Sequence, residues 1–391
     1  MQNKFTQKIQ KFFKTDFGIA LIIIFIWKII MTSIGFIIDL NSGGATSIIN
    51  HTNAWDSGWY ITIINDHYVS NAVSAAFYPL FPLLVGLIHF ASFGFIDILT
   101  SGQIINTISI WLAISALLKI AKILVGNKNK YWLVALLLSA PAAFFLHVFY
   151  SEALFMAVAF WAYYFALKHK WLRMGVLLAI LTATRLPSIL IIGLCGLEFM
   201  QTYQWNIRKI FNKNILYFLL APIGFISYGL YLLRAQGDFF AMFSAYHKST
   251  DWIYQVFDIN IFKTMARAAY QVLLAVIGRR PYDHDLFINN ALPIACISLL
   301  AICSIYLLIK HRNKFIPLGV FGAASIILFT INSNVVSAHR YVLPCITIYI
   351  ALILFFQKSK YSNAFLTFIC IMGISIQLML FAMFINGTFA G

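Results

Sequence analysis

The fold class follows from the first long apolar run, residues 17–38, which reads FGIALIIIFIWKIIMTSIGFII. Such a run is long enough to cross the bilayer, because about 20 apolar residues in a helix span a ~30 Å hydrocarbon layer. It is preceded by four lysines, Lys4, Lys8, Lys11 and Lys14. Residues 39–102, which follow it, contain no lysine or arginine. Because positive residues gather on the cytoplasmic side of a membrane, this asymmetry predicts a cytoplasmic N-terminus and an outer location for 39–102.

Similar runs recur along nearly the whole chain. It is 61% hydrophobic and only 10% charged, with a mean hydropathy of +0.85, whereas soluble domains carry about 25% charged residues. The runs are continuous rather than alternating, which favours helices over an outer-membrane barrel. With the basic clusters placed in the cytoplasm, eleven spans are expected, near 17–38, 103–123, 131–148, 152–167, 172–185, 187–202, 215–234, 290–309, 315–331, 340–356 and 362–385. The sequence therefore predicts an all-α polytopic membrane protein.

This topology places the two long loops, 39–102 and 235–289, on the outer side of a single integral membrane domain. The domain covers residues 1–391, without an internal repeat or a separate soluble part. Every carboxylate except Asp16 and Glu198 then lies on the outer side. A membrane protein that keeps its carboxylates and long loops on one face is expected to work on that face.

One apolar segment, 77–94, could itself cross the membrane. If it did, all later loops would invert, and more basic residues would move outside than inside, against the usual bias. Its two prolines, Pro79 and Pro82, and its His89 fit a helix that lies in the membrane interface. We therefore expect interfacial helices in the first outer loop.

Cysteine and charge patterns argue against several other functions. The five cysteines lie singly in apolar runs without CxxC spacing, which supports neither a disulfide framework nor a zinc site. The adjacent Asp283, His284 and Asp285 would point to opposite sides of an extended chain, so a metal cluster is not expected there. The net charge of +16 is scattered between spans rather than gathered on one face. Membrane lipids, and not nucleic acid, are therefore the expected surroundings.

The densest polar stretch is HTNAWDSGWY, residues 51–60. Asp56 lies between Trp55 and Trp59 and is followed by Tyr60. Apolar neighbours can raise the proton affinity of a carboxylate, which suits a general base. The alternative is that the aromatic residues form an interfacial belt and that Asp56 caps a short helix. The sequence leaves both interpretations open.

Two further carboxylates are candidates for the same face. Asp66 follows Asp56 by about three helical turns and would supply either a second carboxylate or a solvated loop end. Glu152 follows Tyr150 and Ser151 in a short outer turn. A carboxylate at this depth is costly unless it is paired or lines a wet cavity. The alternative is a helix start capped by Ser151.

Arginines with the same predicted location could bind a phosphate. Arg185 divides two short apolar runs, and irregular backbone at that depth is tolerated only where it is buried in protein or lines a cavity. A planar guanidinium suits phosphate, although Arg185 could instead reach the outer headgroups. His339 and Arg340 open a later span and admit the same two interpretations, while Arg234 and Asp238 flank the second long loop.

These motifs together resemble a known family. Trp55–Tyr60 (WDSGWY), followed by Phe77–Leu84 (FYPLFPLL), is similar to the opening of the glycosylphosphatidylinositol mannosyltransferase II (PIG-V-like) family of GT-C membrane glycosyltransferases, which has bacterial members. Weaker similarities follow in the same order, at Tyr150–Glu152, Thr184–Arg185 with Pro187, Gly237–Asp238, and Arg340–Tyr341 with Pro344. The resemblance covers roughly residues 15–390. Leu186 and His339 depart from the family pattern, which bears on the acceptor more than on the reaction.

The resemblance implies a GT-C bundle in which Asp56 is the catalytic base. The sugar, most plausibly mannose, would come from a polyprenyl- or dolichyl-phosphate donor and pass to a glycan or glycolipid acceptor outside the membrane. Donor phosphate would bind Arg185, Arg340 and Arg234. Substrate contacts would come from Trp55, Trp59, Tyr60, Asp66, Glu152, Asp238, His339 and Tyr341.

Several points stay open in the sequence. No organic cofactor is indicated, and dependence on a divalent metal is undecided. A bacterial plasma membrane with an outer active site is expected, with an endoplasmic reticulum membrane and a lumenal site as the alternative. The rival function is that of a transporter or flippase for a lipid-linked or anionic solute, in which the outer arginines bind phosphate without chemistry.

Overall fold

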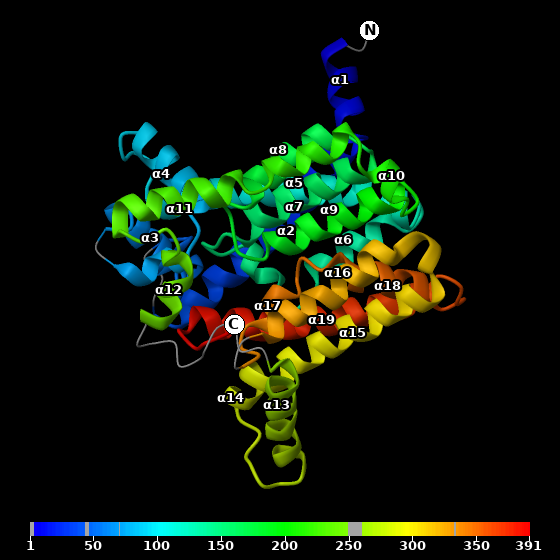
Figure 1. The fold of residues 1–391 in the computed structure, drawn as a ribbon. Helices are drawn as coiled ribbons and strands as arrows, with labels where there is room; N and C mark the ends of the chain where they lie inside the picture. The colour runs from blue at the N-terminus through cyan, green and yellow to red at the C-terminus, as the bar shows by residue number, and fades with distance from the viewer. Residues whose placement is uncertain (1–3, 44–46, 70, 249–259, 332–333) are drawn as a thin grey trace.

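The computed structural model describes residues 4–43, 47–69, 71–248, 260–331 and 334–391, and every regular element in these ranges is helical (Figure 1). Six helical segments in the described chain are long and apolar enough to cross a membrane. They are α2 (Asp16–Asn41), α5 (Ile98–Leu124), η4 (Lys213–Leu220) with α11 (Ile223–Gln236), α14 (His284–Leu286) with η5 (Phe287–Ala291) and α15 (Leu292–Lys310), α16 (Arg312–Thr330) and α19 (Ser362–Ile385). This length and composition mark a membrane-embedded protein.

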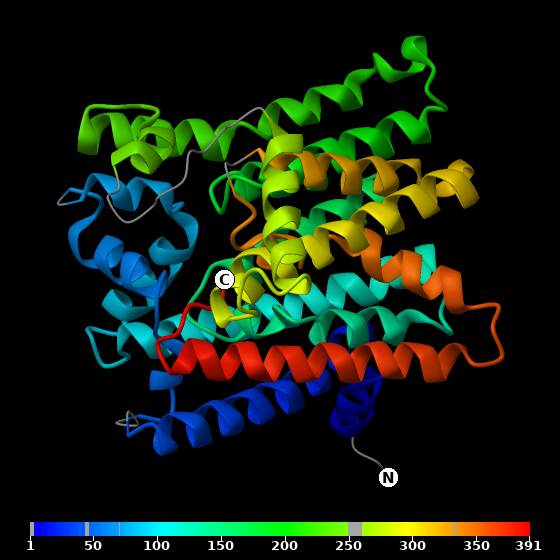
Figure 2. The same ribbon diagram turned by 90° about the horizontal axis from the view of Figure 1, so that it is seen from below.

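Shorter helices fill the rest of the bundle and cover one end of it. The apolar ones are α4 (Leu80–Ala91), α7 (Glu152–Leu167), α8 (Trp171–Leu181), α9 (Ser188–Thr202) and α18 (Ile346–Phe356). The others are α1 (Lys4–Phe13), η1 (Asn50–Thr52), α3 (Ser57–Asp66), η2 (Ala72–Ala76), α6 (Lys130–Leu138), η3 (Ala143–Leu146), α10 (Ile207–Ile210), α12 (Ala241–Lys248), α13 (Ile261–Val276) and α17 (Ala338–Tyr341). Helices α3, α4 and α12 gather at one end of the bundle, opposite α10 (Figure 1), and the long helices run side by side (Figure 2).

The helices depart from the expected spans where prolines interrupt them. The expected span 131–148 is helical only to Leu138, after which Pro141 interrupts the chain. The expected span 340–356 divides into α17 and α18 around Pro344, and Pro222 separates η4 from α11. Proline lacks an N–H donor and disfavours helical geometry at the residue before it, which explains each interruption.

The segment 77–94 forms only the short helix α4, of 12 residues, directly after Pro79. At 1.5 Å per residue its length is about 18 Å, well short of a ~30 Å hydrocarbon layer. Two aromatic side chains just beyond it, Phe93 and Phe95, are 91% and 93% exposed. Other apolar helices of the bundle are as short as α4, so its position in the membrane interface stays a prediction.

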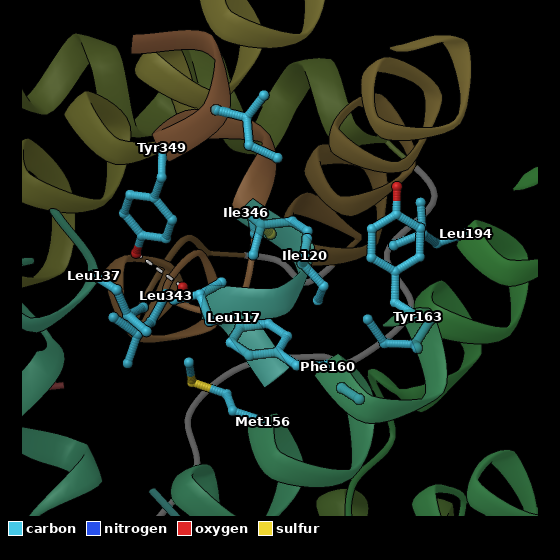
Figure 3. Packing of buried hydrophobic residues seen from close by; sticks show 14 of the residues in the cluster. Leu117, Ile120, Leu137, Met156, Phe160, Tyr163, Leu194, Leu343, Ile346 and Tyr349 are labelled. Carbon is cyan, nitrogen blue, oxygen red and sulfur yellow. Dashed lines mark hydrogen bonds between the residues drawn. The ribbon is translucent and has the colours of Figure 1, made fainter. Parts of the chain in front are cut away.

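Helix α5 lies at the centre of the apolar core. Figure 3 shows Leu117 and Ile120 of α5 facing Met156 and Phe160 of α7, with side chains of α9 and α18 beside them. The break before α18 leaves carbonyl groups without helical partners, and the Tyr349 hydroxyl donates to one of them, that of Leu343, at 2.9 Å (Figure 3). Apolar packing and this satisfied carbonyl together allow a non-helical turn inside the bundle.

A buried ion cluster joins the starts of α2 and α6 to the end of α5. The Asp16 carboxylate is 2.7 Å from the Lys122 ammonium, 3.4 Å from that of Lys130 and 3.9 Å from that of Lys119. Helix α1 leaves the bundle next to this cluster (Figure 1). The sequence predicts the cytoplasmic side for these three lysines and for Asp16.

Helices α8 and α11 approach closely at a glycine. A Cβ atom on Gly224 of α11 would lie 2.2 Å from the carbonyl oxygen of Ala179 in α8. The Thr182 hydroxyl, at the end of α8, donates to the Ala221 carbonyl at 2.7 Å. The contact therefore fixes the turn that leads from α8 to Arg185.

Gly224→Ala is expected to destabilise the protein by roughly 1–3 kcal/mol, because the new methyl group meets backbone that cannot move without separating the helices. Gly193→Ala in α9 is the matched control, since its Cβ has no atom within 4 Å and alanine favours the helix. Thermal unfolding of both purified variants in detergent measures the difference. Equal unfolding temperatures would contradict the close contact.

Candidate functional site

Five of the site residues predicted from the sequence line one cavity of about 230 Å³: Asp56, Tyr60, Arg185, Arg340 and Tyr341. Asp56 precedes α3, Arg185 lies in the turn between α8 and α9, and Arg340 belongs to α17. The turn after α8 and the short helix α17 both follow interruptions of longer apolar runs. The irregular backbone thus lines a cavity, as membrane-embedded irregular structure must.

The loop before α3 holds Asp56 at the cavity through its backbone. The Tyr150 hydroxyl accepts a hydrogen bond from the Asp56 N–H at 3.0 Å and donates to the Ala54 carbonyl at 3.2 Å. Between them, Trp55 adopts a left-handed conformation with φ of 55°. The Asp56 carboxylate makes no cap on α3; it instead accepts from the Arg340 Nη1 at 2.7 Å and is 33% exposed. The helix-cap interpretation of Asp56 therefore does not describe its side chain.

Glu152 lies behind the two arginines at the start of α7. Its Oε1 pairs with the Arg185 Nη1 and accepts a hydrogen bond from the Arg340 Nε. The Glu152 side chain is 7% exposed, and its Oε2 makes no hydrogen bond within the described chain. One buried carboxylate thus holds two guanidinium groups side by side.

Ser151 and Tyr60 complete the polar wall next to Arg185. Ser151 makes no side-chain cap on α7, and its hydroxyl lies 3.4 Å from the Arg185 Nη1 and 2.8 Å from the Tyr60 hydroxyl. Burial raises the pKa of Tyr60 to about 12, so it stays a neutral hydrogen-bonding group. The wall therefore offers hydroxyl groups beside the charged ones.

Aromatic rings surround both guanidinium groups and much of the cavity. The Arg340 guanidinium carbon lies 4.8 Å from the centre of the Phe145 ring and 4.6 Å from that of Tyr150. The Arg185 guanidinium is 5.8 Å from the ring of Tyr341, which also lines the cavity. Such rings attract cations and exclude water, which strengthens the field of the arginines in the cavity.

The two predicted tryptophans lie beside the cavity rather than in its lining. Trp59 stacks on the lining residue Phe77, with ring centres 5.8 Å apart. Trp55 is 46% exposed and makes an edge contact of 5.5 Å with Phe389, another lining residue. Both therefore support the wall through a neighbouring ring.

Asp66 and Asp238 are not among the lining residues. Asp66 accepts from the backbone N–H of Tyr68 at 3.2 Å. Asp238 accepts from the backbone N–H of Phe240 and from the Ser244 hydroxyl, each at 2.8 Å. The carboxylates of both residues thus take part in local turns of the loops 39–102 and 235–289.

His339 and Arg234 also lie outside the lining. The buried His339 ring bonds through its Nε2 to the Ala390 carbonyl at 3.0 Å and so holds the C-terminal tail, whose Gly391 lines the cavity. Arg234 is exposed on α11 and does not line the cavity with Arg185 and Arg340. No sequence motif indicated that the tail reaches the cavity, because a long-range bond to a backbone carbonyl holds it there.

A second buried polar cluster lies beside α2. The Nε2 atoms of His51 and His147 are 2.9 Å apart, and the rings are 3% and 1% exposed. The Lys28 ammonium donates to the Gln103 side chain at 2.9 Å and lies 3.4 Å from the His147 carbonyl. The sequence motifs did not predict this cluster, and the only indication of it was Lys28 inside the first expected span.

Metal-ligating side chains do not gather in the chain as described. Nowhere among the described residues do three His, Cys, Asp or Glu side chains lie together as a metal site. Asp283 precedes α14 and caps it by accepting from the Leu286 N–H, and Asp285, within α14, pairs with Arg280 at 3.2 Å. These two carboxylates therefore have structural contacts of their own.

Replacing Glu152 tests the shared carboxylate. Glu152→Gln leaves two buried arginines with less negative charge, and removal of one partner of a buried ion pair typically costs about 3–5 kcal/mol. Asp285→Asn is the matched control, because that carboxylate is 66% exposed and such pairs contribute about 0–1 kcal/mol. Thermal unfolding in detergent should separate the two variants. A Glu152→Gln protein as stable as Asp285→Asn would contradict the pairing.

The buried histidine pair predicts a pH-dependent stability. Burial, and then the charge of Lys28, lowers the pKa of His51 to about 4 from its usual 6.5. The folded state therefore favours neutral His51, while the unfolded chain takes up the proton between pH 6.5 and 4. Stability from this residue is present above about pH 6.5 and is lost as the pH falls toward 4. Unfolding temperatures should fall less steeply over this range in His51→Asn, and an unchanged slope would contradict the assignment.

The cavity thus brings together the partly exposed Asp56 carboxylate, two arginines that pair with the same glutamate, and aromatic walls. These groups can accept a proton at Asp56 and bind an anion beside it. No family model, curated protein or solved structure has significant similarity to this chain, so its interpretation depends on this geometry and on the sequence motifs.

Proposed function

We propose that this protein is an inverting GT-C-type glycosyltransferase. It would move a sugar, most plausibly mannose, from a polyprenyl- or dolichyl-phosphate donor to a glycan or glycolipid hydroxyl outside the membrane. The observation that supports this best is the Asp56 carboxylate, which faces the cavity 2.7 Å from Arg340 and beside Arg185. These three residues come from three separate motifs of the PIG-V-like resemblance.

An arrangement of eleven spans is part of this proposal. The six long segments would be joined by α7, α8, α9 and α18, and by the interrupted segment that contains α6 and η3. Short helices cross a membrane when neighbouring helices and cavities shield their ends. The cavity would then open at the outer face of a bacterial plasma membrane or, alternatively, at the lumenal face of the endoplasmic reticulum.

The proposed reaction is a single displacement. The acceptor hydroxyl gives its proton to the Asp56 carboxylate as its oxygen forms a bond to the anomeric carbon. The bond between that carbon and the donor phosphate oxygen breaks, and the lipid phosphate leaves with the electron pair. One base and no covalent intermediate are needed, so the anomeric configuration inverts.

The contacts of Arg340 couple the proton transfer to the departure of the phosphate. Before reaction, one of its N–H groups is held by the Asp56 carboxylate and another by Glu152. Protonation of Asp56 removes the negative charge from that first contact, while negative charge grows on the leaving phosphate. Arg340 can then bind the phosphate together with Arg185, which lines the same cavity.

A transporter or flippase for a lipid-linked or anionic solute is the second candidate. The observation in its favour is Lys28, an ionisable residue inside a predicted span that is bonded to Gln103 and lies near His147. Intramembrane charged groups often mark solute or proton pathways. The products distinguish the two candidates, because a transferase releases lipid phosphate in step with glycoside, whereas a flippase leaves its lipid intact.

The test is transfer of radiolabelled mannose from polyprenyl-phosphate mannose by the purified full-length protein. Asp56→Asn should reduce the rate by about 10²–10⁴-fold, because loss of a general base costs this much. Asp285→Asn, an exposed carboxylate outside the cavity, should keep the wild-type rate. Near-normal turnover by Asp56→Asn would exclude Asp56 as the base, and labelled lipid crossing the membrane without transfer would favour the flippase.

A further inference from the structure

A second cavity, of about 290 Å³, is lined in part by the loop that carries Asp56. It is lined by Asp39, Asn50, His51, Asn53, Ala54 and Ile385. The cavity is bounded by the ends of α2 and α19 and by the segment around η1, and it shares no lining residue with the first cavity. Its volume is close to the lower end, about 300 Å³, of small-molecule sites.

Two of its lining side chains are buried with polar atoms left unpaired. Asp39 is 8% exposed, and its Oδ2 has no hydrogen-bond partner in the described chain. His51 is 3% exposed, and its Nδ1 has none either. Asp39 also lies in the last turn of α2, where the helix dipole is unfavourable for a carboxylate. Unpaired buried groups of this kind are costly and call for a partner from outside the chain.

The lining indicates which class of ligand would supply those partners. Among the described residues, no lysine or arginine lines the cavity, so a phosphate would meet the Asp39 carboxylate and neutral groups there. Lys28 lies behind the paired histidines and its charge acts on His51, which opposes a second cation there. A carboxylate, an imidazole, amides and the Ala54 carbonyl suit a neutral ligand whose hydroxyl groups both donate and accept.

The cavity is linked to Asp56 through the backbone. The Ala54 carbonyl accepts from the Tyr150 hydroxyl, which in turn accepts from the Asp56 N–H. Asn53 accepts from the Ser57 hydroxyl at 2.9 Å at the start of α3. A ligand in the second cavity would therefore touch the loop that positions the Asp56 carboxylate in the first.

We propose that this second cavity binds a neutral sugar unit of the acceptor through Asp39 and His51, while the reacting hydroxyl reaches Asp56. This assignment rests on the proposed glycosyl transfer. Asp39 and His51 are substrate-positioning residues in this scheme and take no part in bond formation. A hydroxyl group of the bound sugar would then donate to the Asp39 oxygen, which otherwise lowers stability because it is buried without a partner.

Binding is tested first, without chemistry, in the Asp56→Asn protein. Methyl α-mannoside is titrated by calorimetry, with inorganic phosphate as the anionic comparison. Asp39→Asn added to this protein should weaken mannoside binding tenfold or more, yet leave the unfolding temperature equal or higher, because Asp39 Oδ2 has no internal bond to lose. Asp285→Asn is the matched control and should change neither quantity.

Unchanged mannoside affinity in Asp39→Asn would overturn the inference, as would a lower unfolding temperature with the same affinity. Phosphate that binds in place of the mannoside would overturn it too, and so would sodium or calcium that stabilises only the chain with Asp39 intact. These results would show an anion site or a cation site instead.

The active protein separates this inference from the proposed function. In transfer assays, Asp39→Asn should raise the KM for the acceptor at least tenfold while kcat stays within about threefold. Transfer with an unchanged acceptor KM would exclude the second cavity as an acceptor site and leave the transferase intact. If the protein shows no transfer but binds the mannoside in a way that depends on Asp39, the sugar site stands and the proposed transfer reaction is wrong.

Discussion

The arrangement depends on one buried carboxylate that is shared by two arginines. Glu152 begins α7 and holds both Arg185 and Arg340, and Arg340 in turn holds Asp56. In a poorly hydrated interior, two guanidinium groups this close repel one another unless a carboxylate lies between them. Three parts of the chain therefore have to meet at one point: the start of α7, the turn between α8 and α9, and α17. Asp56 is drawn to the same point and left as the most exposed of the four.

The cavities exist because the chain does not complete its helices near these charges. Pro187 follows the turn that carries Arg185, and Pro344 ends the short helix that carries Arg340. Complete helices at both places would pack side chain against side chain and leave no room for a ligand. The interruptions free backbone carbonyls, and bonds such as that from the Tyr349 hydroxyl to Leu343 satisfy them. The bundle thus combines continuous helices for support with broken ones around its polar sites.

Both cavities keep polar atoms that have no hydrogen-bond partner among the described residues. Glu152 Oε2 lies behind the first cavity, and Asp39 Oδ2 and His51 Nδ1 line the second. Buried groups without partners reduce stability, and proteins commonly retain them where function requires them. The loop from Asn53 to Asp56 contributes to both cavities, because Asn53 and Ala54 line the second and Asp56 lines the first. A ligand in either cavity would therefore act on the surroundings of the Asp56 carboxylate.

The sequence by itself determined the helical class, the membrane environment and the residue types of the first site. Hydropathy and charge are sums over neighbouring residues, so they can be read without a fold, and the motifs around Asp56, Arg185 and Arg340 were visible in the same way. Only the tertiary structure decided which of these residues meet. Arg340 pairs with Glu152 and Asp56 across 188 and 284 positions of chain, while Arg234 stays apart on α11. The pairing of His51 with His147 and the return of the C-terminal tail to the cavity are likewise long-range contacts. Such contacts depend on how whole helices pack, and no local pattern of residues encodes that packing.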